Sequence, residues 1–367
     1  MNGPGPAPWA LELRRSGAWI MLKLRERRGA LRGRMDQARN TLYGALWRES
    51  ARIVGAELSE LTDGFYEIRR GDRVTRVWQS LVPLDDPVTL RIAANKPLVH
   101  GLLSARGLPV PRHRAFSLAT IGDAIQFLDE VKTDCVVKPA AGTGAGAGVT
   151  TRVRTRRDLV HAAVFASALD RQLLIERQHP GESYRLLYLD GELLDAVRRR
   201  PPHVVGDGRS TVRQLIHAEN RRRMERAGVA SSWLISVDPD CRATLRNQGF
   251  GLRSVAPAGL SLAVKTVPNE NSESENECVT TQLGPGLTEE GARAATCLGV
   301  RLAGVDVLTA SLGASLAESG GIINEVNTTP GLHMHCRLGD PGRGARVAGL
   351  VLERLLGRAD GARGAER

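Results

Sequence analysis

The sequence predicts an α/β fold of the α+β kind, in which antiparallel hairpins are interspersed with amphipathic helices. Short apolar segments with strand-like alternation flank the turns Gly71-Asp72 and Asp190-Gly191, and both dipeptides favour tight hairpins. Segments with the apolar spacing of helices lie between these hairpins. The length of 367 residues is enough for two or three domains. Strands mixed with helices in this order are typical of α/β and α+β proteins.

The composition favours an anionic ligand. The net charge is +11, because 51 lysines and arginines outnumber 40 aspartates and glutamates. Only 4% of the residues are aromatic, which is poor material for stacking on bases, so we do not expect a nucleic acid partner. Lysine is rare, and it is not interchangeable with arginine at a phosphate. The lysines are therefore informative: Lys23, Lys96, Lys132, Lys138 and Lys265.

The cysteines and the apolar runs bear on the compartment. The five cysteines lack CxxC or His-paired spacing, which indicates reduced thiols in a cytoplasmic protein. No apolar run approaches the ~20 residues that cross a membrane. Residues 1–40 form a basic extension, either an amphipathic helix on an anionic surface or a solvated helix packed on the body. Residues 359–367 are expected to be disordered.

The elements of the first half follow in order. Asn40 can cap a helix over residues 41–54, and strands at 65–70 and 73–79 form the first hairpin. A helix is expected over 89–106, ending at Gly107. The remaining elements are a helix at 123–131, a strand at 135–138, a glycine loop at 140–148, a strand at 149–154, a helix at 157–169 and a strand at 173–176.

The second half begins with the second hairpin, at 184–189 and 192–197. Ser210 can cap a helix over 211–226. Residues 237–282 look like strands and loops, with helices at 288–298 and 343–358 and apolar strands at 302–308 and near 322–327.

Three polar residues on the last two strands suggest a metal site. Glu325 and Asn327 share one face of their strand, and Asp306 lies in the neighbouring apolar run. An oxygen-only cluster suits Mg²⁺, which usually also binds phosphate oxygens. The alternative is that Asp306 ends a strand and the other two residues begin a turn.

A strand that ends in a lysine and a glycine-rich loop suggests a phosphate site. Lys138 closes the strand, and the loop contains Gly142, Gly144, Gly146 and Gly148. Glycines let backbone N–H groups approach phosphate oxygens. The order GxxxxGK[ST] is absent, so this is no Walker loop. A strand rather than a helix follows, which excludes a dinucleotide-binding fingerprint.

Two further segments have polar residues at strand ends. The segment LLIERQHPGESYR ends its strand at Glu176 and can present backbone groups to an adenine edge, or it is a solvated strand edge. The segment RRRPPHVVGDG leads from three arginines through Pro201-Pro202 to His203. An arginine run is usually a solvated face, but here the rigid Pro-Pro suggests a fixed position that faces an anion.

These segments, in this order, resemble the ATP-grasp ligases from about residue 81 to residue 335. The closest likeness is to the ATP-grasp segment of cyanophycin synthetase. The matching segments include NKPLVHGLLSARGLPVP, VVKPAAGTGAGAGV, HVVGDGRST, LAGVDVL and NEVNTTPGLHMH. The resemblance implies an ATP-grasp fold with a preceding α/β domain (41–92), a lid half (93–175) and a metal and substrate half (176–358). We also expect a homo-oligomer.

The resemblance also implies an activity and a set of site residues. Such a ligase joins a small-molecule carboxylate and an amine, from amino acids or peptides, through an acyl phosphate. It uses ATP and two Mg²⁺ ions, for which Mn²⁺ can substitute. The metal ligands would be Asp306, Glu325 and Asn327. ATP would meet Lys96, Lys138, Gly142, Gly144, Gly146, Gly148, Glu176, Arg177, Gln178, Glu182 and Ser183. The catalytic residues would be Arg199, Lys265 and Asn269, and the substrate residues Arg185, Arg199, His203 and His335.

Departures from the family pattern leave alternatives open. The expected ribose-binding acid falls on Ser183, with Glu182 beside it. A glycine-rich loop of the relatives becomes acidic at 269–274, which suggests a cationic or amine-rich substrate. We expect no second, Mur-ligase-like domain. The alternatives are an enzyme that passes the acyl phosphate to a thiol or hydroxyl, and a non-catalytic nucleotide-binding protein or a nucleic-acid binder with a basic N-terminus.

Overall fold

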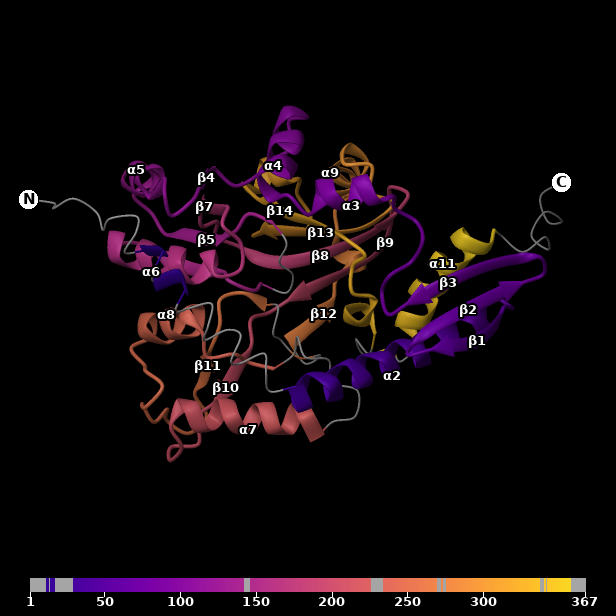
Figure 1. Ribbon diagram of the computed structural model, residues 1–367, viewed down its shortest axis with the longest axis horizontal. Coiled ribbons are helices and arrows are strands. Elements are labelled where there is room, and N and C mark those ends of the chain that lie inside the picture. Colours follow the sequence, from indigo (N-terminus) through magenta and orange to yellow (C-terminus); the bar gives the residue numbers. More distant parts are fainter. Residues whose placement is uncertain are drawn as a thin grey trace, which may run out of the picture.

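Four antiparallel sheets organise the part of the chain that the structure describes. The computed structural model describes residues 11–12, 14–16, 29–141, 146–225, 234–268, 272, 275–336, 340 and 342–357. Figure 1 shows a five-stranded sheet at the centre, a four-stranded sheet beside it, a three-stranded sheet at one end and a small two-stranded unit.

The central sheet has the strand order β12-β9-β8-β13-β14. Both of its faces are buried, which explains why β13 is almost continuously apolar and why most residues of β8 are buried. One face packs on α3, α4 and α9, and the other packs on α2 and α11. The strands are β8 (Glu182–Leu189), β9 (Glu192–Arg199), β12 (Asn276–Cys278), β13 (Leu302–Thr309) and β14 (Ile322–Thr328); the helices are α3 (Pro87–Ala93), α4 (Lys96–Ala105) and α9 (Pro285–Cys297).

The four-stranded sheet has the order β4-β7-β5-β6 and a core of its own. Phe127 and Leu159 pack from its two helices onto Val137 and Ile175. Its elements are β4 (His113–Phe116), β5 (Cys135–Pro139), β6 (Thr150–Val153), β7 (Leu173–Arg177), α5 (Ile121–Val131) and α6 (Arg156–Ser167).

The three-stranded sheet is held against α2 and α11. Trp47 of α2 is fully buried, and its indole N–H donates to the backbone oxygen of Gln79 at 2.8 Å. Ser50 Oγ donates to the backbone oxygen of Ala345 at 3.0 Å. The elements are α2 (Gly29–Ile53), β1 (Glu57–Thr62), β2 (Phe65–Arg70), β3 (Arg73–Trp78) and α11 (Arg343–Leu356).

The small unit pairs two short strands and packs them on two helices. It consists of β10 (His203–Val205), α7 (Val212–Glu225), α8 (Pro239–Asn247) and β11 (Ser261–Ala263). Short helical turns complete the described elements: η4 (Thr280–Gln282), α10 (Leu316–Ser319) and η5 (Leu332–His335).

Both predicted hairpins are confirmed, but two predicted helices differ. The helix expected from residue 41 begins at Gly29, so Asn40 lies inside it and accepts a hydrogen bond from Gln79 Nε2 at 2.9 Å. The helix expected over 89–106 is two helices. Asn95 is extended there, and its side chain caps α4 by accepting from the backbone N–H of Leu98.

Smaller corrections concern caps and missed elements. The first turn of α7 is capped by Thr211 Oγ1, which accepts from Gln214 N, while Ser210 Oγ donates to Asp207. The prediction missed β1, β4 and α8. The predicted domain boundaries stay predictions, although α2 runs across the one at residue 40. The tail 359–367 lies outside the described residues. Within them, no helix combines the length and apolar character needed to cross a membrane.

Candidate active site

A cavity of about 820 Å³ collects most of the predicted site residues that the structure describes. Its walls come from the central sheet, the four-stranded sheet, α2, α4 and the small unit. Gly142, Gly144 and Asn269 lie outside the described residues. The predicted residues that line the cavity are Lys96, Lys138, Gly146, Glu176, Arg177, Gln178, Glu182, Ser183, Arg185, Arg199, Lys265, Asp306, Glu325 and Asn327.

The predicted metal ligands meet on one face of the central sheet. Asp306 on β13 is register-paired with Glu325 on β14 and with Arg185 on β8, so the three side chains form a row across three strands. Asn327 is paired with Gly304, and its Nδ2 lies 3.3 Å from Asp306 Oδ2. The alternative, in which Asp306 ends a strand and the others begin a turn, is therefore wrong.

Two arginines hold Asp306. Arg185 donates to it through Nε and through Nη2, the latter at 2.7 Å, and Arg199 Nη1 lies 3.4 Å away. Burial alone would raise the pKa of Asp306, but the charge and hydrogen bonds of Arg185 lower it. Gly304 makes room for this arrangement, because a Cβ there would lie 2.9 Å from Arg185 Cδ and from Pro330 Cβ.

The two cavity lysines also have acidic partners. Lys96 Nζ lies 3.3 Å from Glu325 Oε1, and Lys138 Nζ lies 2.8 Å from Glu176 Oε2. Lys138 and Glu176 are both buried on the neighbouring strands β5 and β7. The backbone N–H of Lys96 donates to Ala140 O at 3.0 Å, which ties α4 to the start of the glycine loop.

Behind Glu176 lies a buried histidine. The Nδ1 atom of His100 is 3.6 Å from Glu176 Oε1, and burial lowers the pKa of His100 to about 4, so its ring is neutral at pH 7. Glu176 is thus buried between Lys138 and His100 rather than part of a solvated strand edge.

The rest of the predicted nucleotide region follows β7. Gln178 Oε1 accepts from the backbone N–H of Arg152 at 2.8 Å, and Glu182 Oε2 accepts from Tyr184 OH at 2.8 Å. Gly146 has φ of 70° and lines the cavity. Gly148 has φ of 77° and does not line the cavity; a Cβ there would lie 2.8 Å from Pro139 Cγ and Leu169 Cδ1, so close packing requires glycine at this position.

Two predicted substrate residues, His203 and His335, do not line the cavity. His203 on β10 is exposed, and its Nδ1 lies 3.1 Å from Glu275 Oε1. Lys265 does line the cavity, but its Nζ lies 2.5 Å from Asp238 Oδ2. Glu275, next to the acidic loop, is buried and 3.4 Å from Arg223 Nη2, so its charge is compensated internally.

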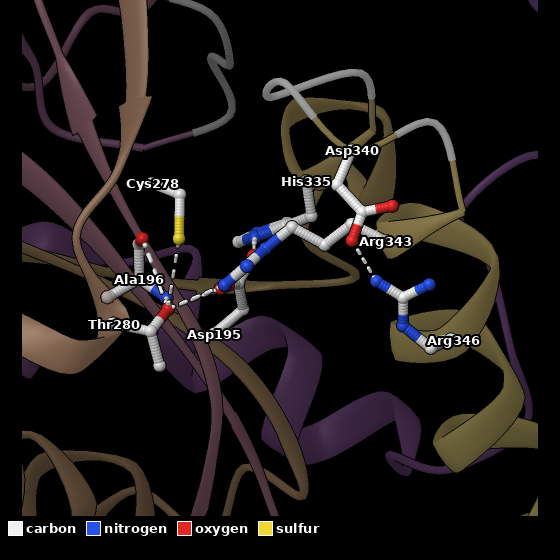
Figure 2. A network of polar contacts seen from close by, with 8 residues as sticks. All are labelled: Asp195, Ala196, Cys278, Thr280, His335, Asp340, Arg343 and Arg346. Atoms are coloured by element: carbon white, nitrogen blue, oxygen red, sulfur yellow. Dashed lines mark hydrogen bonds and ion pairs between the residues drawn. The ribbon is translucent and has the colours of Figure 1, made fainter.

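His335 belongs to a buried network instead (Figure 2). Its ring is fully buried, and Nδ1 lies 2.7 Å from Asp195 Oδ2. Arg343 of α11 also donates to Asp195, and its Nη2 donates to Thr280 Oγ1 at 2.9 Å. Burial alone would raise the pKa of Asp195, but the hydrogen bonds from His335 and Arg343 hold it well below its usual range. The network joins β9, η4, η5 and α11.

One wall of the cavity consists of residues that were not predicted from the sequence. Arg39 and Tyr43 on α2, Ser80 after β3 and His333 on η5 all line it. Tyr43 OH lies 3.0 Å from His333 Nδ1. The spacing of Arg39 and Tyr43 places them on the same helix face, but only the folded chain brings that face to the cavity.

The donor set suits Mg²⁺ when phosphate completes it. Within the described residues, no three His, Cys, Asp or Glu side chains form a metal-binding group by themselves. The three predicted ligands offer two carboxylates and one amide, and each of these carboxylates faces a cationic side chain. Hard oxygen donors shared with phosphate are the usual Mg²⁺ environment.

The chain is similar in sequence to proteins whose names state an activity. No protein-family model matches the chain. It is 30% identical over 278 residues to the cyanophycin synthetase of Nostoc sp. (strain PCC 7120), which covers 73% of this chain and 29% of that protein. It is 27% identical over 306 residues to the glutathione biosynthesis bifunctional protein GshAB of Streptococcus mutans, covering 82% and 40%.

A solved structure supports the fold. The crystal structure of a bifunctional glutathione synthetase from Pasteurella multocida aligns with a TM-score of 0.50 and 20% identity, over 82% of this chain and 41% of that one. The chain spans less than half the length of these relatives.

Proposed function

Because this chain belongs to the ATP-grasp family of ligases, we propose that it joins a carboxylate to an amine at the expense of ATP. A carboxylate oxygen attacks the γ-phosphorus, ADP leaves, and an acyl phosphate forms. The amine then attacks the acyl carbon, phosphate leaves, and an amide remains. The substrates are proposed to be amino acids or peptides.

One observation carries this proposal. Asp306 and Glu325 are paired across neighbouring strands, and two lysines from α4 and β5 line the same cavity. A row of carboxylates next to two ammonium groups suits a magnesium-bound triphosphate better than it suits an uncharged ligand.

The roles of the residues follow from their contacts. Lys96 and Lys138 would bind phosphate oxygens, and Asp306, Glu325 and Asn327 would hold two Mg²⁺ ions. The metal would neutralise the charge that develops during phosphoryl transfer. Lys96, whose Nζ lies 3.3 Å from Glu325 Oε1, would be positioned to bind a phosphate oxygen if Glu325 held a metal ion.

Arg185 and Arg199 would hold the reacting carboxylate and the acyl phosphate made from it. Both are buried beside Asp306, and burial lowers the pKa of Arg199 to about 10, so it stays protonated at pH 7. Preorganised donors of this kind stabilise developing negative charge.

The experiment is an ADP-release screen of amino acids and short peptides with Mg²⁺–ATP, with hydroxylamine to trap the acyl phosphate as a hydroxamate. We expect ADP and hydroxamate in equal amounts. The Glu325→Gln variant should lose at least 99% of the turnover, and Glu192→Gln, at an exposed position on β9, should keep it. Thiol and alcohol acceptors in the same screen would reveal acyl transfer to sulfur or oxygen. ATP binding without any ADP release would contradict the ligase proposal.

A further inference from the structure

The cavity wall that consists of Arg39, Tyr43, Ser80 and His333 is held in place by contacts of α2 with its neighbours. Tyr43 is buried and contacts His333 by an edge-to-face ring packing with centroids 6.0 Å apart, in addition to the hydrogen bond. Trp47, one turn further along α2, is fixed to Gln79. Arg39 therefore projects into the cavity from a helix that is anchored on two sides.

The cation of this wall differs from three other cations of the cavity, which are each paired with a carboxylate. Lys96, Lys138 and Arg185 each face a carboxylate. The side chain of Arg39, by contrast, makes no hydrogen bond or ion pair with any residue that the structure describes. A half-buried guanidinium without an acidic partner is a ready site for a carboxylate, which it can bind through two parallel hydrogen bonds.

The neighbours of Arg39 leave that charge uncompensated. Burial raises the pKa of Tyr43 to about 12 and lowers the pKa of His333 to about 3, so both are neutral at pH 7. Ser80, the other polar neighbour, donates through Oγ to the backbone oxygen of Thr329 at 3.3 Å. The wall thus combines one cation with neutral polar groups, and it contains no carboxylate among the described residues.

We propose that Arg39 binds a second carboxylate of the acyl substrate, the one that is not phosphorylated. This inference rests on the ligase proposal, in which Arg185 and Arg199 hold the reacting carboxylate. A substrate that reaches from these arginines to Arg39 carries two acidic groups, so it is a dicarboxylic amino acid or an acidic peptide. The expectation of a cationic substrate then concerns the amine alone.

A binding experiment tests the subsite without turnover. The wild-type protein is titrated calorimetrically with succinate, glutarate, adipate and the dipeptide Ala-Glu, each against its monoamide (Ala-Gln for the dipeptide), with Mg²⁺ and a non-hydrolysable ATP analogue. At least one diacid should bind tenfold or more tightly than its monoamide. Arg39→Gln should abolish this preference, Arg39→Lys should retain part of it, and Arg48→Gln on an exposed position of α2 should leave it unchanged. Equal binding of acids and amides by the wild type would overturn the proposal.

The trapping assay separates recognition from structural damage. With aspartate or glutamate as the acyl substrate, Arg39→Gln should raise the KM for the acid at least tenfold, with kcat and the KM for ATP within twofold of wild type. A purely structural role would instead lower the melting temperature and change both constants. If diacids and monoacids react equally well, the subsite is refuted while the ligase stands. If no carboxylate reacts, the proposed ligase activity is contradicted. The calorimetric titration then still shows whether Arg39 binds a carboxylate.

Discussion

At the scale of single residues, the cavity consists of opposite charges that hold one another in place. Lys138 and Glu176 are both buried, so neither can lose its partner cheaply. In Lys138→Met, the unpaired buried carboxylate should cost about 3–5 kcal/mol of the free energy of unfolding. If Lys138 binds ATP as proposed, the KM for ATP should rise at least tenfold, because the ammonium group that would contact the phosphates is lost.

The double variant Lys138→Met/Glu176→Gln separates these two effects. It should recover most of the stability in urea denaturation, but not the affinity for ATP in the ADP-release assay. Lys132→Met, at an exposed position, is the control and should behave like wild type in both measurements. Recovery of a wild-type KM for ATP in the double variant would show that Lys138 only balances Glu176.

Gly304 is the second single residue whose substitution should affect both stability and turnover. An added methyl group would meet Arg185 Cδ and Pro330 Cβ at 2.9 Å, so Gly304→Ala should displace Arg185 from Asp306. We expect a loss of about 1–3 kcal/mol in the free energy of unfolding, as in other overpacked sites, and at least tenfold lower turnover. Gly313→Ala adds a methyl group in open space and should leave both unchanged. Normal turnover in Gly304→Ala would mean that the position of Arg185 does not matter.

At the scale of elements, local signals predicted most of the hairpins and helices. The Gly71-Asp72 and Asp190-Gly191 turns are found where expected, because their backbone requirements are local. The division of residues 89–106 into two helices was not predicted, since the extended backbone at Asn95 is fixed partly by its pairing with Ala141, which follows β5. That pairing depends on tertiary structure and leaves no periodic signal.

The buried network around Asp195 should make the stability of the fold depend on pH. The pKa of Asp195 is held below its usual value of about 3.9, so its contribution to stability is complete above about pH 4 and is lost as the pH falls further. Asp195→Asn should cost about 3 kcal/mol at pH 7, because Arg343 loses its charged partner.

Chemical denaturation at a series of pH values measures this cost. The difference between Asp195→Asn and wild type should shrink as the pH is lowered from 4 to 2. Asp340→Asn is the control, because Asp340 binds Arg346 at the surface in the same region of Figure 2. Solvent screens this exposed pair, so its loss should change the stability little. A pH-independent difference for Asp195→Asn would show that the carboxylate stabilises by packing alone.

At the scale of the whole molecule, the cavity exists only when several cores are packed together. Strand residues within motifs, such as Lys138, Asp306 and Glu325, could be predicted to converge because the order of the strands implies it. Tyr43 and His333 could not, because they are 290 positions apart in the sequence and meet only through the packing of α2 against η5. The wall formed by Arg39, Tyr43, Ser80 and His333 is therefore the part of the cavity that sequence motifs describe least.

This assembly predicts how the nucleotide acts on global stability. A ligand that binds only the folded chain stabilises it by mass action, by about 2.7 kcal/mol at 100 times its Kd. A non-hydrolysable ATP analogue with Mg²⁺ should therefore raise the free energy of unfolding by that amount in wild type and in Glu192→Gln, and by much less in Glu325→Gln. The measurement is made at 150 mM salt, where the Debye length is about 8 Å and the net charge of +11 attracts anions only weakly. Equal stabilisation by tripolyphosphate without Mg²⁺ would mean that general charge attraction, rather than a metal–nucleotide site, holds the ligand.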